Sequence, residues 1–283
     1  QAQVTTNSGS GLAATYPNLA AAITDLNLLA VPATSPVIIT LTGDETSPAG
    51  GFSITGTGTA VNTIIIQGVG STITAPTTHT VGALNDAIFK IIGGDYITIQ
   101  NFTMLENAAN LVTTAASNNM TEWGVALLYA TTTNGAQNNT IQNNTITLNR
   151  VYQNTFGIYS NSTHSATSVT TSATATTSAG GNSGLKIYTN TISNVNQGIV
   201  VVGPTAVADM NTGIDIGGVV SGTGNTITNF GTTGTFSGYA NVSGTVNGIL
   251  VRNSLGFNIS RNNLTSSSGA TGVTAGTLNG IQI

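Results

Sequence analysis

Apolar residues alternate with Thr, Ser and Asn over much of the chain. The segment 138–149, NNTIQNNTITLN, places Ile141, Ile146 and Leu148 among Thr and Asn with hardly a charge nearby. β-Branched residues at alternating positions favour a strand, and Asn favours tight corners in which its amide hydrogen-bonds to the backbone. The pattern therefore predicts short strands that end at Asn-rich corners.

The same pattern recurs, which predicts a repeat architecture. Three segments share the spacing Ile-x-x-Asn-x-aliphatic: Ile141/Asn144/Ile146, Ile187/Asn190/Ile192 and Ile259/Asn262/Leu264. A second element is a strand that begins with Gly and follows each Asn-rich strand, at Gly124, Gly157, Gly198, Gly213, Gly248 and Gly280. A unit that recurs about every 30 to 40 residues, with insertions of variable length, is typical of a solenoid.

The beginning of the chain has a helical pattern. Residues 15–30 place Leu19, Ile23 and Leu26 on one helical face, and Pro17 suits a first turn. A helix in this place can cover the open end of a stack of strands, whose backbone groups would otherwise pair with another molecule. We therefore expect an N-terminal segment with a capping helix.

The rest of the chain reads as strands and turns. We expect residues 1–36 to form the capped N-terminal segment and residues 37–283 to form the solenoid. The segment 161–182 consists almost wholly of Ser, Thr, Ala, Gly and Asn, and it has too few apolar residues to pack. We expect it to be a long loop.

Charged residues are scarce. They make up 5% of the chain, with 5 basic and 9 acidic residues and a net charge of -4, so no basic patch for nucleic acid is expected. The chain has no cysteine and no apolar run near the roughly 18 to 20 residues that cross a bilayer. Because the sequence starts as if a signal peptide had been removed before Gln1, we expect a secreted or cell-surface protein without a membrane span.

The Ile-x-x-Asn-x-Ile segments, the Gly-Ile strands and the phrase DYITIQNFT at 95–103 resemble right-handed parallel β-helix proteins. This architecture is shared by pectate-lyase-like enzymes and many bacterial surface proteins. The opening at 16–27, followed by 36–42, is similar to the start of large secreted repeat proteins of Bacteroidetes-type bacteria. Many of those proteins leave the cell by type IX secretion. The resemblance implies an all-β fold, a single right-handed parallel β-helix with a short N-terminal capping helix.

In that fold, equivalent residues of successive coils stack about 4.8 Å apart. Asn side chains at one corner can then form an amide ladder, in which each amide bridges its neighbours. Asn144, Asn190 and Asn262 are the candidates for such a ladder. For these residues a structural role is favoured over a catalytic one.

β-Helix lyases bind calcium through clustered Asp and Glu and use an Arg or Lys as base. The weak candidates for such chemistry are Asp209, Asp215, Lys186 and Arg252. Because Asp215 alternates with isoleucines, it should point outward, and an isolated outward Asp is ordinarily solvated surface. We therefore expect no catalytic residue, no metal and no cofactor.

Hydrolases of the polygalacturonase kind need two carboxylates a few ångströms apart. Neither Asp-Asp nor Gly-His-Gly occurs in the chain. His79 and His164 lie in Thr-rich segments far from acidic residues in the sequence, so both are expected to be loop histidines.

Two kinds of side chain could bind a ligand on the surface. Thr-x-Thr pairs could align into rows like those of ice-binding solenoids; examples are Thr72/Thr74, Thr145/Thr147 and Thr226/Thr228. However, the pairs do not share one position within the repeat, and Thr is simply favoured on strands.

Tyr159 and Tyr188 could stack a sugar ring if both faced outward on neighbouring coils. The alternative for the tyrosines is edge packing beneath the long loop.

The sequence thus favours a non-enzymatic secreted or cell-surface β-helix that acts as a rod, stalk, or adhesive or assembly segment. A polysaccharide lyase or glycoside hydrolase is the alternative, and an ice-binding solenoid is a minor one. Polysaccharide or other surface proteins are the expected partners. Because 280–283 begins one more Gly-Ile strand, we also expect further coils, or a subunit, to pack on the C-terminal end.

Overall fold

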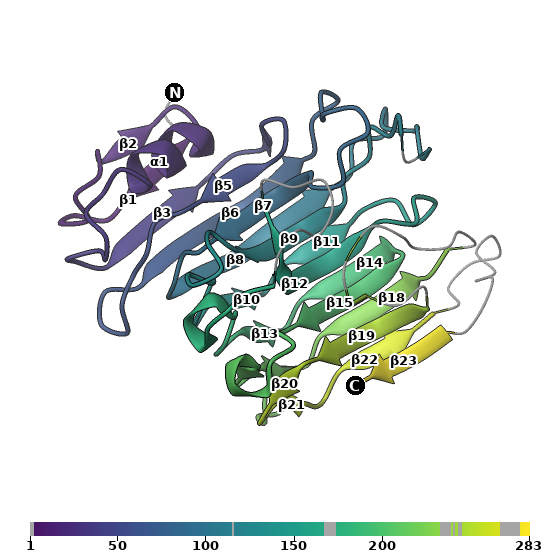
Figure 1. The fold of residues 1–283 in the computed structure, drawn as a ribbon. Coiled ribbons are helices and arrows are strands. Elements are labelled where there is room, and N and C mark those ends of the chain that lie inside the picture. The colour runs from purple at the N-terminus through teal and green to yellow at the C-terminus, as the bar shows by residue number, and fades with distance from the viewer. Residues whose placement is uncertain are drawn as a thin grey trace.

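The computed structural model describes residues 3–114, 116–166, 174–232, 239, 241–242, 245–266 and 278–283. Within them, strands stack coil upon coil from the N-terminal to the C-terminal end of the molecule (Figure 1). Consecutive coils contribute neighbouring parallel strands to two long sheets. The predicted fold, an all-β right-handed parallel β-helix with a short N-terminal helix, is confirmed.

The larger sheet, called sheet A, runs along the whole stack. Its strands are β1 (Val4–Thr6), β2 (Thr15–Tyr16), β3 (Val37–Leu41), β4 (Glu45–Thr46), β6 (Ile64–Thr74), β8 (Ile97–Leu105), β10 (Thr140–Gln142), β11 (Thr145–Thr147), β13 (Lys186–Tyr188), β14 (Thr191–Val195), β17 (Asp215–Ile216), β18 (Thr226–Phe230), β21 (Asn258–Ile259) and β22 (Asn263–Thr265). Only β1 departs from the parallel arrangement, since it pairs antiparallel with β2 and β3.

Sheet A has two flanks, which meet at a corner. Flank 1 consists of β3, the first halves of β6 and β8, and β10, β13, β17 and β21. Flank 2 consists of β4, the second halves of β6 and β8, and β11, β14, β18 and β22. In β8 the corner falls at Asn101 and in the next coil at Asn143, both with positive φ, a conformation that Asn tolerates better than most residues.

The second sheet, sheet B, lies across the core from sheet A and is wholly parallel. Its strands are β5 (Phe52–Ile54), β7 (Ala87–Ile92), β9 (Trp123–Tyr129), β12 (Phe156–Ser165), β15 (Gln197–Val202), β19 (Val246–Arg252) and β23 (Leu278–Gln282). The remaining elements are β16 (Asn211–Thr212), which pairs with β20 (Ser254–Leu255), and the short 3-10 helices η1 (Ser178–Gly180) and η2 (Val207–Asp209). Gly213, predicted to start a strand like those at Gly198 and Gly248, instead precedes β17 of sheet A.

Aliphatic side chains of both sheets fill the space between them. Ile146, Ile192 and Ile227 stack in register on flank 2, and each is fully buried. Opposite them lie the glycines that begin the sheet B segments. A Cβ atom at Gly157 would lie 2.3 Å from Cγ2 of Ile192, which explains why Gly recurs at this position: only hydrogen leaves room for the facing isoleucine.

The N-terminal end of the stack carries helix α1 (Leu19–Leu26), whose buried face packs on the core (Figure 1). Asn18 caps the helix by accepting a hydrogen bond from the backbone of Ala21 at 2.8 Å, and the Glu45 carboxylate accepts from the backbone of Leu19 at 2.9 Å. The helix is shorter than the predicted 15–30, because residues 15–16 pair with β1 instead.

The expected loop at 161–182 is wrong at its beginning. Strand β12 continues to Ser165, and Asn161 and Thr163 are buried there. The polar side chains pack because they bond to one another: the Asn161 amide accepts from the Thr163 backbone at 2.8 Å and donates to the Tyr159 hydroxyl at 2.7 Å. Residues 167–173 of the predicted loop lie outside the described residues.

Candidate functional site

An asparagine column runs inside the corner between flank 1 and flank 2. Its members are Asn144, Asn190, Asn225 and Asn262, from four successive coils. The side-chain oxygens of Asn190, Asn225 and Asn262 each accept from both the backbone and the side-chain amide of the asparagine one coil before, at 2.8 to 3.1 Å, and that of Asn144 accepts from the backbone of Phe102. Each side-chain amide also donates to an isoleucine carbonyl of the preceding coil. The column therefore satisfies backbone groups at the corner that the strands of the two flanks leave unpaired.

Asn225 was not among the ladder candidates of the sequence, although it occupies the same place. Its segment lacks the isoleucine three positions earlier, because Gly218 to Thr223 form a turn there instead. The hydrogen bonds of Asn190 show that the position is equivalent, since its side chain donates to Asn225 at 3.0 Å.

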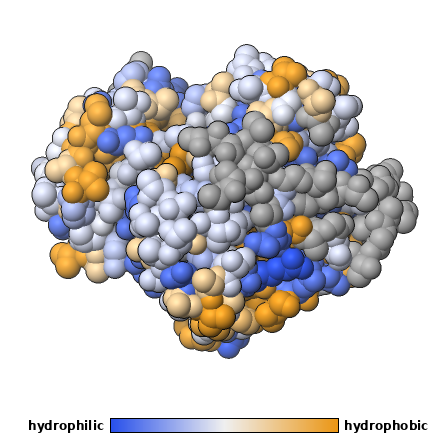
Figure 2. Space-filling model, in the orientation of Figure 1, coloured by the Kyte–Doolittle hydropathy of each residue, from blue (hydrophilic) through white to orange (hydrophobic). Residues whose placement is uncertain are grey.

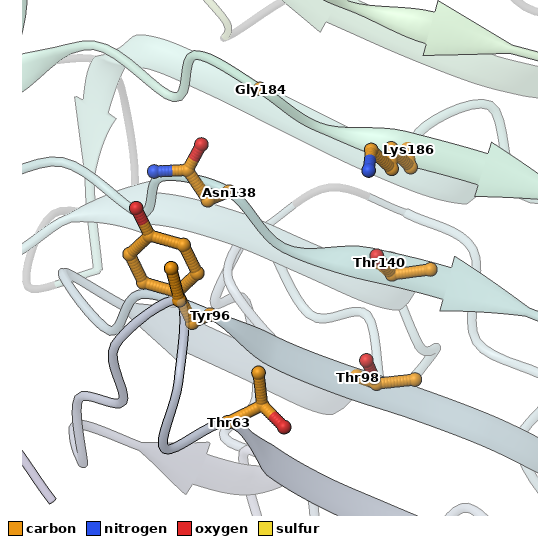
Figure 3. A pocket seen from close by; sticks show the side chains of 8 residues that line it. Thr63, Tyr96, Thr98, Asn138, Thr140, Gly184 and Lys186 are labelled. Carbon is orange, nitrogen blue, oxygen red and sulfur yellow. The ribbon is translucent and has the colours of Figure 1, made fainter.

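A shallow groove of about 290 Å³ lies on flank 1. We call it the Tyr96 groove; it is lined by Ala60, Thr63, Tyr96, Thr98, Asn138, Thr140, Gly184 and Lys186. Figure 3 shows Thr98, Thr140 and Lys186 one above another on neighbouring strands, with the Tyr96 ring and the Asn138 amide to one side. The lining offers hydroxyls, one amide, one aromatic ring and one cation.

The structure brings together three of the residues singled out in the sequence and separates two others. Lys186 and Asp215 are register neighbours on β13 and β17, and the Tyr188 hydroxyl donates to the Asp215 carboxylate at 2.6 Å. Asp209 lies apart from this pair in η2, and Arg252 ends β19 in sheet B, where its guanidinium donates to the backbone of Asn241 at 2.8 Å. The hydrogen bond to Asp215 raises the pKa of Tyr188, although burial contributes more.

The pairing of Tyr159 with Tyr188 on one surface is not formed. Tyr159 lies on β12 of sheet B and is fully buried, and its ring stacks on Trp123 with centroids 5.0 Å apart. The outer face of sheet B is covered, because Tyr239 from a later segment packs against both rings. The ring of His164, expected in a loop, also packs edge-on against Trp123 from the end of β12.

The threonines of flank 2 share one register, contrary to the sequence analysis. One outward column consists of Thr72, Thr103, Thr145, Thr191 and Thr226. A second outward column, two residues further along each strand, consists of Thr46, Thr74, Leu105, Thr147, Ser193, Thr228 and Thr265. The sequence concealed this alignment because the coils differ in length, so equal register does not mean equal spacing.

A second cluster, which the sequence analysis missed, lies outside sheet B. It contains His79, Asp86, Lys90, Glu106 and Glu122, all of which are largely or fully buried. A chain with so few charges places four of its acidic and basic side chains together here. The signal available in the sequence was the position of Lys90 within an apolar strand and of Glu122 beside Trp123, where a charge is costly unless it has partners.

Hydrogen bonds join this cluster to its surroundings. Glu122 accepts from the Tyr152 hydroxyl at 2.7 Å and from the backbone of Asp86 at 2.9 Å. The His79 ring lies 3.5 Å from the Asp86 carboxylate and 3.1 Å from the Thr121 hydroxyl. These contacts link two loops to the outer face of sheet B.

Burial shifts the pKa values of the cluster toward the uncharged forms. It raises the pKa of Asp86 to about 6, an effect that the nearby Lys90 partly offsets. It lowers the pKa of His79 to about 4 and that of Lys90 from its usual value. The pKa of Glu122 is raised well above its usual value, first by burial and then by the neighbouring Asp86. The cluster has the pKa pattern of many active sites, but its side chains are closed off from solvent.

Among the described residues, no group of three His, Asp or Glu side chains is arranged to hold a metal ion. In the same part of the chain, no helix has the length and apolar character needed to cross a membrane. The Tyr96 groove, with the adjacent residues of flank 1, is an accessible candidate site.

The asparagine column gives a stability prediction. Asn190→Ala should lower the free energy of unfolding by about 2 to 5 kcal/mol, because it leaves buried backbone and amide groups of both neighbouring coils without partners. Thr191→Ala is the matched control, since Thr191 is exposed and follows directly in the chain. It should cost less than about 1 kcal/mol. Equal losses in urea unfolding of the two variants would contradict a supporting role of the column.

The raised pKa of Asp86 gives a pH prediction. Between about pH 4 and pH 6 the folded protein keeps the Asp86 carboxyl protonated, whereas the unfolded chain releases this proton. The contribution of the proton to the free energy of unfolding is therefore lost as the pH rises through about 6. The Asp86→Asn variant has no titratable group at this position. Relative to the wild type, its free energy of unfolding should therefore rise by about 1 to 3 kcal/mol between about pH 4 and pH 7. Melting temperatures that keep a constant difference across this pH range would refute the prediction.

Comparisons of the chain with protein-family models, with curated proteins and with solved structures found no match. The β-helix fold therefore rests on the sheets described above, and the function is inferred from the geometry of the flanks.

Proposed function

We propose that the chain is a non-enzymatic, secreted or cell-surface β-helix. It acts as a stiff rod or stalk and mediates adhesion or assembly through its flanks. The observation that carries the proposal is the continuous stack of coils, whose outward flanks present mostly hydroxyl and amide groups. Successive coils bond to one another through the two sheets, and the four coils from Asn144 to Asn262 also bond through the asparagine column. Such a stack resists bending because each coil is held by the next.

The surface supports a role in contact with other molecules. In the orientation of Figure 2, much of the visible surface is polar or weakly polar, and apolar side chains form separate patches. Few charges surround the hydroxyl and amide groups, so binding to a neutral or weakly charged surface meets little electrostatic repulsion. The scarcity of charge, which is unusual for a cytosolic enzyme, fits the proposed location outside the cell.

The candidate catalytic residues do not form the set that an enzyme of this fold requires. Such an enzyme needs at least two acidic groups and usually a base at one groove. Asp215 has Lys186 beside it, but Asp209 and Arg252 belong to other elements. The lining of the Tyr96 groove includes no carboxylate.

A sedimentation assay tests the proposal against the enzymatic alternative. The purified chain should co-sediment with insoluble polysaccharides or bacterial cell envelopes, while uronate polymers and neutral polysaccharides release neither unsaturated products nor reducing ends. If products accumulate, and Asp215→Asn stops them while the matched variant Asp209→Asn does not, the protein is a polysaccharide-active enzyme.

The threonine columns of flank 2 support ice binding as a second candidate. Their side chains repeat about every 4.8 Å along the stack and about every 6.6 Å along each strand, and β-branched residues hold few rotamers, so the array is pre-organised. Neither column contains a charged or aromatic residue. A surface with this regularity suits a ligand that is itself a lattice.

Inhibition of ice recrystallisation tests this candidate. The wild type should slow the growth of ice grains, and Thr145→Tyr should abolish the effect because the ring interrupts the array. Thr140→Tyr is the matched control on flank 1 and should keep the activity. A wild type without effect on ice, or equal activity of both variants, removes ice binding from consideration.

A further inference from the structure

Tyr96 occupies a corner at which every later coil has a residue that tolerates a left-handed backbone, whereas the coil before it has Thr63 without a positive φ. The equivalent positions, two residues before the register neighbours of flank 1, are Asn138, Gly184, Gly213 and Gly256, and all have positive φ. Tyr96 has φ of 54° there. A bulky residue in this conformation is strained, and such strain is concentrated at functional sites.

The backbone of Tyr96 is held by the coils on either side. Its N–H donates to the carbonyl of Gln137 at 3.1 Å, and its carbonyl accepts from the N–H of Ile64 at 3.0 Å. Asn or Gly could make the same backbone bonds without strain, so these contacts do not explain the aromatic side chain. The ring is half-buried and forms a wall of the Tyr96 groove (Figure 3). Within the described residues, its hydroxyl has no protein hydrogen-bond partner.

Lys186 supplies the charge of the groove. The other basic side chains are engaged by backbone carbonyls: Lys90 by Asn85, Arg150 by Gly231, Arg252 by Asn241 and Arg261 by Val219. Lys186 is exposed, and its ammonium group has neither a hydrogen bond nor an ion pair with any described residue. In an acidic protein this leaves one accessible ammonium group beside an aromatic ring.

The carboxylate that neighbours Lys186 in register already has hydrogen-bond partners. Asp215 accepts hydrogen bonds from Tyr188 at 2.6 Å, from the Asn258 side chain at 2.8 Å and from the backbone of Gly218 at 3.1 Å. These three donors occupy both oxygens of the carboxylate, and among the described residues no ion pair joins Asp215 to Lys186. An anion from outside can therefore approach Lys186 without displacing an existing ion pair.

We propose that the Tyr96 groove is a non-catalytic binding site for an anionic sugar, a pyranose that carries a carboxylate or a sulfate ester. The Tyr96 ring offers a flat apolar surface to the C–H face of the sugar, and Asn138, Thr98 and Thr140 offer hydrogen bonds to its hydroxyls. Lys186 pairs with the anionic group. The groove, at about 290 Å³, has room for one or two sugar rings.

This inference rests on the proposed role in adhesion and names the ligand of one flank. Because the groove is shallow and open, the affinity of a single sugar should be weak, with a Kd on the order of millimolar. Adhesion would then come from many such contacts along a polysaccharide or between copies. Raising the salt concentration should weaken binding, since the ion pair is exposed to solvent.

NMR titration of the 15N-labelled chain tests the proposal with defined probes. Glucuronate and glucose 6-sulfate distinguish the carboxylate from the sulfate ester, glucose is the neutral control, and acetate and inorganic sulfate are the controls for the anion alone. At least one anionic sugar should shift the amide signals around 96, 138 and 186 with an affinity at least tenfold above that of glucose and of the simple anions. Equal affinity for glucose, or equal affinity for the simple anions, would overturn the proposal.

Two variants separate binding from folding. The Tyr96→Asn variant has at this corner the same residue type as the next coil, which has Asn138 there. Its melting temperature should therefore equal or exceed that of the wild type, while its affinity for the sugar should fall at least tenfold. Lys186→Met should remove the preference for the anionic sugar, and Arg261→Met, an exposed cation elsewhere, should leave it unchanged. A lower melting temperature for Tyr96→Asn would assign Tyr96 a structural role and refute the proposal, as would unchanged binding by either groove variant.

The same variants distinguish this proposal from the wider one. If Lys186→Met and Tyr96→Asn still co-sediment with polysaccharide as the wild type does, and neither anionic sugar shifts the signals, the groove is not the site while adhesion stands. If the wild type neither sediments nor binds the sugars, both proposals fail.

Discussion

The hydrogen bonds between successive coils are the interaction on which the rest of this structure depends. A chain with so few charges and no disulfide must hold itself together through burial and backbone pairing. The two sheets pair the strands, but the corner between the two flanks of sheet A would leave backbone groups unsatisfied. The asparagine column supplies the missing partners at one corner, so the aliphatic stacks beside it, Ile146 on Ile192 on Ile227, remain in register.

Around this frame, the two outer surfaces serve different purposes. Flank 1 and flank 2 of sheet A remain accessible and display regular columns of polar side chains. The outer face of sheet B is covered by later parts of the chain, and this covering buries both the Trp123 cluster and the ionisable group around Glu122. Burial shifts the pKa values of those groups toward the uncharged forms, and hydrogen bonds such as that from Tyr152 replace contacts with solvent.

Much of the fold could be predicted because its signals are local. Alternating isoleucines, the recurring Asn and the Gly opposite a facing isoleucine each reflect a contact that repeats in every coil. Features that depend on distant segments could not be found in this way. Tyr159 alternates like an outward residue, and it is buried because Trp123, His164 and Tyr239 pack against it outside sheet B. The threonine alignment was hidden because the coils differ in length. The Tyr96 groove brings together corner residues of successive coils, and among the corners at Tyr96, Asn138 and Gly184 only that of Tyr96 holds a strained, bulky residue.

The asparagine column also has a consequence for how such a protein changes over evolutionary time. Steps in the column span different stretches of chain, from Asn144 to Asn190 and from Asn190 to Asn225, yet the bonds are nearly the same, at 3.1 and 3.0 Å. The pitch of the stack is thus independent of the length of each turn. Insertions can accumulate on the periphery, and whole turns can be duplicated or lost, because each new turn needs only one asparagine at the corner to join the next.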